Sequence, residues 1–261
     1  MEDLIAVAMR SDMKIRTLVL LSAVMIVAGC VAVGDNPNRK ITPPVASPDV
    51  RMLAGAVLPA IYRGDLPCAD CAGIRYQLDV RADRVFFLRT TYLGKGSGEG
   101  ETFDDIGTWN MTPDAQNVVL HGSGEPVMFS IENSETLRKL GSGGKPIDSA
   151  LNYELKRNAS YRPLEPRGPM RGMYSYMADA AVFRECRTQI KMPVAPSTET
   201  GALEKAYLAV RKLPGEELLV SLNGQIAMQA GPDGGAERPT LVVEHLTKVW
   251  SGASCATNVA E

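Results

Sequence analysis

Apolar and polar residues alternate along short segments in the first two thirds of the chain. The clearest segment covers residues 74–81, where Ile, Tyr, Leu and Val alternate with Arg, Gln and Asp. A period of two residues places one set of side chains on each face of a β-strand, so this pattern predicts a strand with one buried face. Asp83 then predicts a turn, and the apolar residues of 85–88 begin the next strand.

Further short segments of this kind lie on both sides of these two strands. They are expected at 56–63, 107–111, 118–121, 127–131, 136–140 and 151–155. The pattern predicts an antiparallel meander of about eight strands that closes into an up-and-down barrel, because closure removes exposed strand edges. Such a barrel is filled by side chains or holds one small ligand. The large residues Tyr76, Leu78, Phe87 and Trp109 favour a filled interior.

A second domain is expected after a segment at 159–169 that is rich in Pro and Arg and reads as a linker. Apolar residues within 203–210 recur at helical spacing, which predicts one amphipathic helix. Asn223-Gly224 predicts a tight hairpin turn. Strands are expected at 173–177, 218–222, 225–228, 241–244 and 247–250. The fold class is therefore all-β, with a barrel followed by a small domain that contains one helix.

The amino-terminal region has the pattern of an export signal. Basic residues follow Met13, and the apolar run 17–27 is too short to span a bilayer. Glu2 and Asp3 suit the basic start of a signal badly, so we expect translation to begin at Met13. We interpret residues 1–29 as a signal peptide.

The run Val27-Ala28-Gly29-Cys30 resembles the lipobox of bacterial lipoproteins. This resemblance implies that Cys30 is the first mature residue and carries acyl chains on its sulfur and its amino group, which together anchor a protein stably. Residue 31 is Val rather than Asp, which implies sorting to the outer membrane with the protein facing the periplasm. Residues 30–54 lack periodicity and are interpreted as a flexible tether.

Charge and residue usage exclude several classes of function. The 261 residues have a formal net charge of −2, which gives no basic field for nucleic acid. The two His residues leave little material for a zinc site or for His-based catalysis. Asp104 and Asp105 are adjacent and would point to opposite faces of a strand, and neither Ser97 nor Ser123 has a His–Asp neighbourhood. We predict that the chain is not an enzyme and has no nucleic-acid partner.

The five cysteines divide into one, two and two. If Cys30 carries lipid, two pairs remain for an oxidising compartment. A bond from Cys186 to Cys255 would close a loop of about 70 residues and contribute about 4 kcal/mol by loop entropy, against about 2 kcal/mol for the short Cys68–Cys71 ring. We therefore expect Cys186 and Cys255 to form a disulfide that stabilises the second domain.

The pair Cys68 and Cys71 leaves three interpretations open: a local disulfide that fixes a loop, a redox-sensing pair, or a metal site. Asp70 disfavours a neighbouring thiolate, unlike the basic surroundings of thiol oxidoreductases, so we exclude that enzyme class. Two thiolates would suit Cu(I), which is a soft ion. The 12 Met residues include a group within 170–177, although Met on a strand is more often core filler.

Several distinctive blocks of sequence occur in both expected domains. They are Tyr62 to Ile74 with both cysteines, Tyr92-Leu93-Gly94, Gly107-Thr108-Trp109, Lys145 to Ser149, Asn152-Tyr153, and Arg171 to Ala180. Together they resemble the NlpE family of envelope lipoproteins over nearly the whole mature chain. The chain departs from that family in a longer Gly-rich loop at 94–100 and in Leu-Gly-Ser at 140–142, where relatives carry an acidic turn residue.

This resemblance implies both fold and function. It implies a lipocalin-like barrel over 55–158 and an OB-like domain over 170–256. It further implies an outer-membrane lipoprotein that senses envelope stress, including surface adhesion, lipoprotein trafficking and redox or copper state, and that signals to a Cpx-type sensor histidine kinase. No cofactor is required, and copper is the candidate metal that Cys68 and Cys71 would bind. The alternative is a periplasmic protein that binds or buffers copper or a small apolar ligand.

Overall fold

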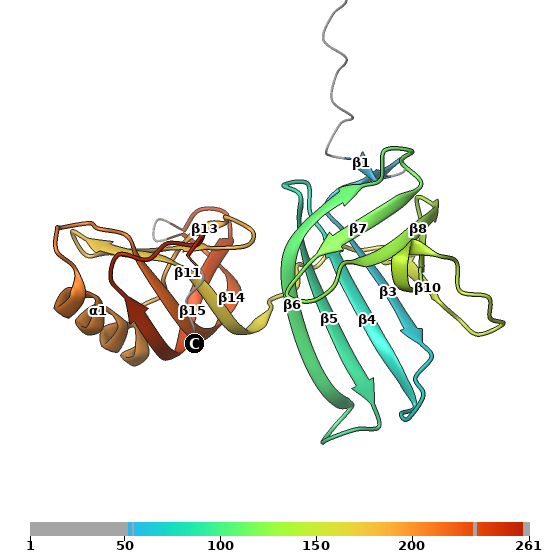
Figure 1. Ribbon diagram of the computed structural model, residues 1–261, viewed down its shortest axis with the longest axis horizontal. Coiled ribbons are helices and arrows are strands. Elements are labelled where there is room, and N and C mark those ends of the chain that lie inside the picture. The colour runs from blue at the N-terminus through green and yellow to red at the C-terminus, as the bar shows by residue number, and fades with distance from the viewer. Residues whose placement is uncertain (1–51, 54, 232–233, 258–261) are drawn as a thin grey trace, which may run out of the picture. The chain divides into compact units, whose positions relative to one another are not determined.

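A computed structural model of the chain describes residues 52–53, 55–231 and 234–257 (Figure 1). The expected signal peptide, Cys30 and nearly all of the expected tether lie outside the described residues. Among the helices that are described, none combines the length and the apolar character needed to cross a membrane.

The first domain is a closed barrel, as the alternating pattern predicts. Its strands follow one another around the barrel in the order β10-β3-β4-β5-β6-β7-β8-β9, and every described pairing is antiparallel. Their bounds are β3 Ala60–Leu66, β4 Gly73–Val80, β5 Val85–Leu93, β6 Gly100–Met111, β7 Asn117–His121, β8 Val127–Asn133, β9 Thr136–Lys139 and β10 Glu154–Arg157. A short hairpin, β1 (Met52–Leu53) with β2 (Ala56–Val57), precedes the barrel.

Large side chains fill the interior of this barrel. The alternation in β4 and β5 directs Leu78, Phe86 and Leu88 inward, where they join Tyr62 and Trp109 in one buried cluster. The expectation of a filled interior therefore holds, but the expected position of Phe87 is wrong. Phe87 lies on the opposite face of β5 from Phe86, outside the interior cluster, because successive strand residues face opposite ways.

The seam that closes the barrel is short. β10 pairs with β3 only through Lys156↔Arg63 and Arg157↔Tyr62. Gly64 continues β3 beside this seam, and a Cβ atom there would collide with the backbone oxygen of Glu154. A glycine is therefore required where the two strand backbones approach each other closely.

Three barrel strands differ in extent from the sequence-based expectation. β3 covers Ala60–Leu66 rather than 56–63, because residues 56–57 form β2 of the preceding hairpin. β6 begins at Gly100 rather than at residue 107, and it continues the β5–β6 hairpin through polar residues that the pattern alone did not mark as a strand. The last strand begins at Glu154 rather than at 151, and Leu151 is exposed. In each case the limits of the strand are set by backbone pairing with the neighbouring strand, and the alternation of side chains does not reveal where that pairing begins and ends.

The second domain is a five-stranded antiparallel sheet in the order β13-β12-β11-β14-β15, with one helix. Its elements are β11 Arg167–Met177, β12 Ala180–Glu185, β13 Lys191–Pro193, α1 Thr198–Val210, β14 Leu218–Gln229 and β15 Arg238–Trp250. A parallel bridge between Val194 and Leu241 links the two ends of the sheet. A small all-β domain with one helix agrees with the expectation, but β12 and β13 were not expected from the sequence. The separate strands expected at 241–244 and 247–250 are wrong, because both segments belong to the one strand β15, which pairs with β14 along its length.

Helix α1 covers one side of this sheet. It begins after Ser197, whose hydroxyl oxygen accepts a hydrogen bond from the Thr200 backbone N–H at 3.0 Å, as an N-cap residue does. Leu203 and Tyr207 are fully buried one turn apart, and the Tyr207 ring packs edge-on against Tyr174 with 5.3 Å between centroids. The helical spacing seen in the sequence thus identifies the buried face correctly.

The predicted hairpin turn at Asn223-Gly224 is wrong. Both residues lie inside the continuous strand β14, which pairs with β15 on one side and β11 on the other. The pairing with β15 shifts register on either side of Leu222 and Asn223, so the strand is irregular there rather than reversed. A Cβ atom on Gly224 would lie 2.7 Å from the Val242 oxygen, so the glycine permits close approach of strands instead of forming a turn.

Candidate functional site

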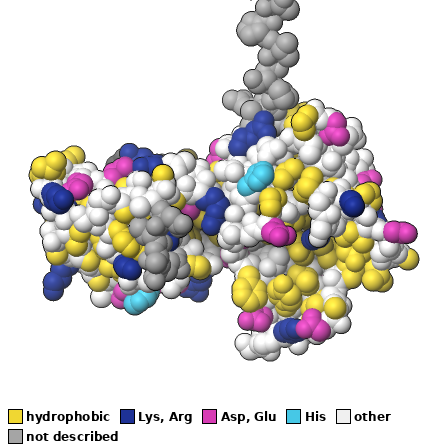
Figure 2. All heavy atoms as spheres, in the orientation of Figure 1, with side chains coloured by type: hydrophobic (Ala, Val, Ile, Leu, Met, Phe, Trp, Pro, Cys, Tyr) yellow, Lys and Arg dark blue, Asp and Glu magenta, His cyan; other side chains and the backbone are white. Residues whose placement is uncertain are grey.

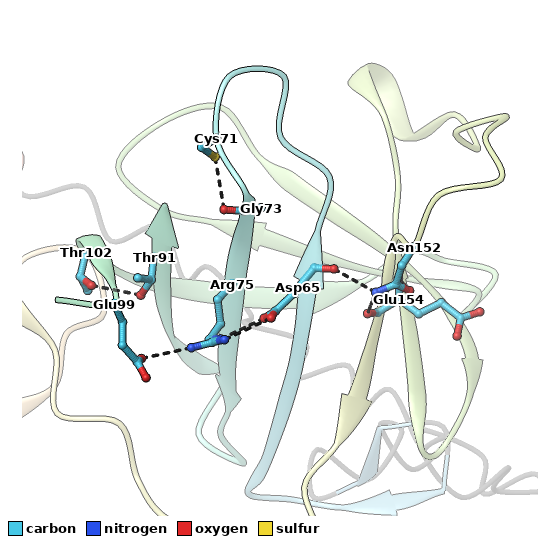
Figure 3. Close-up of polar contacts among 9 residues, drawn as sticks. All are labelled: Asp65, Cys71, Gly73, Arg75, Thr91, Glu99, Thr102, Asn152 and Glu154. Carbon is cyan, nitrogen blue, oxygen red and sulfur yellow. Dashed lines mark hydrogen bonds and ion pairs between the residues drawn. The ribbon is translucent and has the colours of Figure 1, made fainter. Parts of the chain in front are cut away.

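The loop that carries Cys68 and Cys71 joins β3 to β4 at one end of the barrel (Figure 3). The two cysteines are bonded to each other, with 5.4 Å between their Cα atoms, and both are partly exposed. The loop begins where β3 ends at Leu66 and finishes where β4 begins at Gly73. The disulfide therefore closes a small ring within a loop that solvent reaches.

The disulfide loop is attached to the β5–β6 hairpin by two polar contacts. The Ala72 backbone N–H donates to the Leu93 carbonyl at 3.1 Å, and the Lys95 ammonium lies 2.6 Å from a carboxylate oxygen of Asp70. The hydrogen bond from Lys95 holds the pKa of Asp70 below its usual range. A movement of the disulfide loop would therefore displace the β5–β6 hairpin, and a movement of the hairpin would displace the loop.

Arg75 fixes the same end of the barrel from β4 (Figure 3). Its guanidinium donates twice to the Asp65 carboxylate, at 2.9 and 3.2 Å, and once to Glu99 at 3.1 Å. The paired hydrogen bonds from Arg75 hold the pKa of Asp65 below its usual range. The side-chain amide of Asn152 donates to the Asp65 backbone oxygen at 3.0 Å, which extends the network to the segment before β10. Four segments of the chain are thus tied together beside the disulfide.

The sulfur atoms lie against acceptor oxygens. The Cys71 Sγ atom is 3.2 Å from the Gly73 carbonyl oxygen, and the Cys68 Sγ atom is 3.5 Å from Asp70 Oδ1. A disulfide has no proton to donate, so these contacts become hydrogen bonds only after reduction creates thiols. An acceptor beside each sulfur favours the protonated thiol over the thiolate, which is the reactive form in disulfide exchange.

The same loop contains a group of atoms with metal-ligand spacing. One ligand atom each from Cys68, Asp70 and Cys71 lies within 4.8 Å of the others. The two sulfurs become ligands only when the disulfide is reduced, and the Asp70 carboxylate is shared with Lys95. A soft ion such as Cu(I) fits the reduced pair because thiolates are its preferred ligands.

The expected methionine group does not surround this pair. Met170, Met173 and Met177 all lie on β11 of the second domain, and the first two are buried in its core. Met170 and Met173 therefore act as core residues, in agreement with the general behaviour of Met on strands, whereas Met177 is exposed.

Two family models cover most of the described chain. The NlpE N-terminal domain matches residues 62–150, which include the disulfide loop and most of the barrel. The NlpE C-terminal OB domain matches residues 164–256, which include the five-stranded sheet and its helix. Lipoprotein NlpE of Escherichia coli K12 is 35% identical over 200 residues, covering 77% of this chain and 82% of that protein. The chain belongs to the NlpE family.

A solved structure is also similar to this chain in sequence. The crystal structure of the Cpx pathway activator NlpE from Escherichia coli has 32% sequence identity and covers 77% of this chain and all of that chain, with a TM-score of 0.34. Membership of the NlpE family identifies the second domain as an OB domain, as the sequence resemblance implies.

Cys186 and Cys255, the second cysteine pair of this NlpE family member, are also bonded, with 5.2 Å between their Cα atoms. Cys186 follows β12 directly, and its backbone N–H donates to the Arg171 carbonyl at 2.9 Å. Cys255 lies beyond the end of β15. The bond therefore attaches the carboxyl-terminal segment to the turn after β12, across 69 positions of sequence.

The excluded catalytic candidates are held in separate interactions. The Asp104 carboxylate binds the Arg89 guanidinium through two contacts of 2.7 Å, whereas Asp105 accepts from the Ser123 backbone N–H at 3.0 Å. The neighbouring acids thus point to different partners, as adjacent strand positions require. The His121 ring lies 2.7 Å from the Asn110 side-chain oxygen, away from any triad arrangement among the described residues.

The polar network around Arg75 is the feature that sequence reasoning missed. Arg75 and Asp65 face each other across β3 and β4, and their register is a consequence of strand pairing. The sequence did contain a signal for this contact, because Asp65 and Arg75 have opposite charges and lie at similar distances before and after the disulfide loop. Glu99 offers no such signal, since its approach depends on the folding of the β5–β6 hairpin.

Replacing both Cys68 and Cys71 by serine should destabilise the barrel by no more than about 2 kcal/mol, because the ring that the disulfide closes is very small. The contacts of Ala72, Lys95 and Arg75 remain to hold the loop. Urea unfolding followed by Trp109 fluorescence in a Trp250→Phe background measures the effect on the barrel alone, because Trp109 is buried in its core. A loss near 4 kcal/mol would show that the disulfide is a main support of the barrel.

Proposed function

We propose that this chain is an outer-membrane lipoprotein that senses envelope stress and signals to a Cpx-type sensor histidine kinase through its barrel domain. The observation that carries the proposal is membership of the NlpE family, with 35% identity to the lipoprotein NlpE of Escherichia coli. That Escherichia coli protein is described as the Cpx pathway activator. The inputs proposed for this chain are surface adhesion, faulty lipoprotein trafficking and redox or copper state.

The proposed mechanism depends on where the lipid anchor resides. Acylation at Cys30 and the Val at position 31 would send the mature protein to the outer membrane, away from a kinase in the inner membrane. A chain stalled at the inner membrane would bring its barrel within reach of the kinase. Location therefore acts as the switch, and no catalytic step by this chain is needed.

The disulfide loop is the feature of the barrel that best supports a redox or copper input. Cys68 and Cys71 lie in a partly exposed loop that is tied to the β5–β6 hairpin through Ala72 and Lys95. Reduction or metal binding would change the bonding within this loop. The hairpin contacts would transmit that change to the exposed end of the barrel.

Changing Val31→Asp should raise the output of a Cpx-regulated reporter several-fold, because the aspartate would retain the lipoprotein at the inner membrane beside the kinase. The measurement compares reporter activity in strains that express the parent and the variant at equal protein level. Fractionation of the membranes shows whether the variant has moved. The conservative change Val31→Ala is the matched control and should leave both location and reporter output as in the parent.

A second pair of strains separates location from contact. Val31→Asp combined with Cys30→Ser removes the acylated residue, so the reporter should return toward the parent level. An unchanged reporter in a strain where Val31→Asp has demonstrably moved the protein to the inner membrane would refute the proposed mechanism.

A copper-binding or copper-buffering role is the alternative that a specific observation favours. The ligand atoms of Cys68, Asp70 and Cys71 lie within 4.8 Å of one another. Titration of the reduced chain with Cu(I) tests this role, with Cys68→Ser and Cys71→Ser as the variants. Stoichiometric binding that both variants abolish would support buffering. An apolar ligand inside the barrel is less favoured, because residues such as Phe86 and Phe129 fill its interior.

A further inference from the structure

Strand β6 has one edge that the barrel does not use. It pairs with β5 from Gly100 to Thr108, but it pairs with β7 only from Thr108 to Met111. Among the described residues, the first half of β6 therefore pairs with no strand other than β5. Figure 1 shows the lower part of β6 and the β5–β6 hairpin extending well beyond β7. An unpaired strand edge is a template for another strand.

The direction of the backbone groups along this edge follows from one hydrogen bond. The Trp109 backbone N–H donates to the Arg84 carbonyl, which lies on the β5 side. Because backbone groups alternate direction along a strand, those of even-numbered residues in β6 point away from β5. Further along, the side chain of Asp105 accepts from the Ser123 backbone N–H, so the β7–β8 turn covers the edge there. We call Gly100–Phe103 the free edge, and its outward backbone groups belong to Gly100 and Thr102.

An aromatic pair lies on the inner face beside the free edge. Phe103 and Tyr92 pack edge to face, with 5.8 Å between ring centroids. Phe103 is 52% exposed and is the one aromatic among the exposed large apolar side chains of the described residues. With Lys95 and Glu101 these rings line a cavity of about 340 Å³. Figure 2 shows hydrophobic side chains gathered on the lower half of the barrel with charged groups around them.

We propose that the free edge and its aromatic pair bind an extended, basic peptide segment of another protein by strand addition. Thr102 would exchange backbone hydrogen bonds with the segment, and an apolar side chain of the segment would enter the cavity beside Phe103. Backbone bonds supply affinity in this mode of recognition, and pockets for alternate side chains supply specificity. The proposal goes beyond kinase signalling and does not require that the segment come from a kinase.

The acidic residues beside the free edge favour a basic peptide over a second copy of this chain. Glu99 and Glu101 lie on either side of Gly100, and both are exposed. Two copies of this chain that paired through the free edge would bring these like charges together, which disfavours a dimer formed in this way. Lys or Arg on the bound segment would instead compensate the acidic groups. Glu101 takes part in none of the ion pairs formed by the described residues, whereas Glu99 is already paired with Arg75.

The test uses the complete mature chain and peptides selected from a random library of about 12 residues in length, which is longer than the free edge requires. Selected peptides are synthesised, and their affinity is measured by fluorescence anisotropy. We expect peptides in which apolar residues alternate with others and which contain Lys or Arg. We expect Thr102→Pro to weaken their binding at least tenfold, because proline removes the outward N–H donor. Proline at position 102 should leave the hydrogen bonds between β5 and β6 intact, because the N–H donor that it removes faces away from β5.

Thr102→Val is the matched control. It removes the same hydroxyl, which lies 3.0 Å from the Thr91 hydroxyl (Figure 3), but it keeps the backbone donor. Peptide affinity for this variant should equal that of the parent. Phe103→Ala, which leaves the backbone unchanged, should also weaken binding at least tenfold. It provides a second test if Thr102→Pro fails to fold.

Three results would overturn strand addition. One is a selection that yields no peptide with measurable affinity. Another is peptide binding that is equal in the parent, Thr102→Pro and Phe103→Ala. The third is a fluorescent fatty acid that binds with Phe103 dependence while selected peptides fail to compete, because the cavity would then hold an acyl chain. None of these outcomes depends on the Cpx reporter, so the proposed function is tested separately.

Discussion

Replacing Cys186 and Cys255 together by serine should lower the free energy of unfolding of the OB domain by about 4 kcal/mol, as expected for a loop of this length. The bond joins residues 69 positions apart, so the unfolded chain gains much conformational freedom when it is lost. A small domain has little reserve against such a loss, since total stability is commonly about 5–15 kcal/mol. The barrel should keep its stability.

The two tryptophans allow each domain to be observed separately. Trp109 is buried in the barrel, and Trp250 ends β15 of the OB domain beside the Arg171 and Lys248 side chains. Urea unfolding in a Trp109→Phe background reports the OB domain, and a Trp250→Phe background reports the barrel. The transition of Trp250 should move to lower urea concentration in the double serine variant, while that of Trp109 stays in place.

The matched control is the double serine variant of the other cysteine pair. Cys68 and Cys71 close a ring with a sequence separation of 3, so their loss should leave the Trp250 transition unchanged. If the variant that lacks Cys186 and Cys255 unfolds like the parent under oxidising conditions, the second disulfide does not stabilise the OB domain.

Two disulfides of unequal effect would suit a protein exposed to changes in redox state. Loss of the bond at Cys186 would loosen the OB domain, whereas loss of the bond at Cys68 would alter only a loop that is otherwise held by Lys95 and Arg75. The first change is a failure of folding, and the second is a local rearrangement beside the free edge. The distinction follows from loop length alone.

Strand alternation and cysteine spacing allowed much of this structure to be predicted. Residues 74–81 indicated β4, and the apolar face of 203–210 indicated the buried side of α1. Both features arise from residues close in sequence, so the pattern contains the information needed. The closed barrel then followed from the need to remove strand edges.

The errors have a common physical origin in long-range pairing. Asn223-Gly224 has the composition of a tight turn, but pairing with strands on both sides keeps β14 extended. Phe87 is as apolar as Phe86, and only register decides which of them enters the barrel. Local propensity yields to tertiary context at such positions. The network around Arg75 was missed for the same reason, because it joins segments that meet only after folding.

Asp79 shows most strongly how tertiary context overrides the local pattern. It occupies a polar position in the alternation of β4, where solvent exposure is expected, yet it is fully buried. Residues of the linker cover it: the Tyr161 hydroxyl and the Leu164 backbone N–H donate to one carboxylate oxygen, at 3.2 and 3.1 Å. The other oxygen has no hydrogen-bond partner among the described residues. A buried carboxylate with an unpartnered oxygen is costly when charged.

Burial raises the pKa of Asp79 from 3.8 to about 6, although the hydrogen bond from Leu164 and the charge of Arg81 oppose the rise, and Asp83 adds to it. The folded chain therefore holds this proton more tightly than the unfolded chain does. The contribution to stability is complete below about pH 4 and is lost as the pH rises toward about 6. A rise of about two units corresponds to about 3 kcal/mol across this interval.

The change Asp79→Asn should remove this loss. Asparagine keeps an acceptor for Tyr161 and Leu164 but does not ionise, so its unfolding free energy should not fall by the additional 3 kcal/mol or so between pH 4 and pH 7. The variant has a buried amide that needs partners, and its absolute stability reflects that cost as well. The informative quantity is therefore the difference between parent and variant as a function of pH, which cancels the titration of other carboxylates such as Asp65.

Urea unfolding at several pH values, followed by Trp109 fluorescence in a Trp250→Phe background, measures this difference for the barrel. The control is Asp148→Asn, which makes the same chemical change at an exposed residue and should leave the pH profile unchanged. If the free energy of unfolding depends on pH in the same way for the parent and for Asp79→Asn, then ionisation of Asp79 does not destabilise the folded barrel. A difference that grows from pH 4 to pH 6 and then levels would establish that the linker is held against the barrel by a carboxylate that neutral pH destabilises.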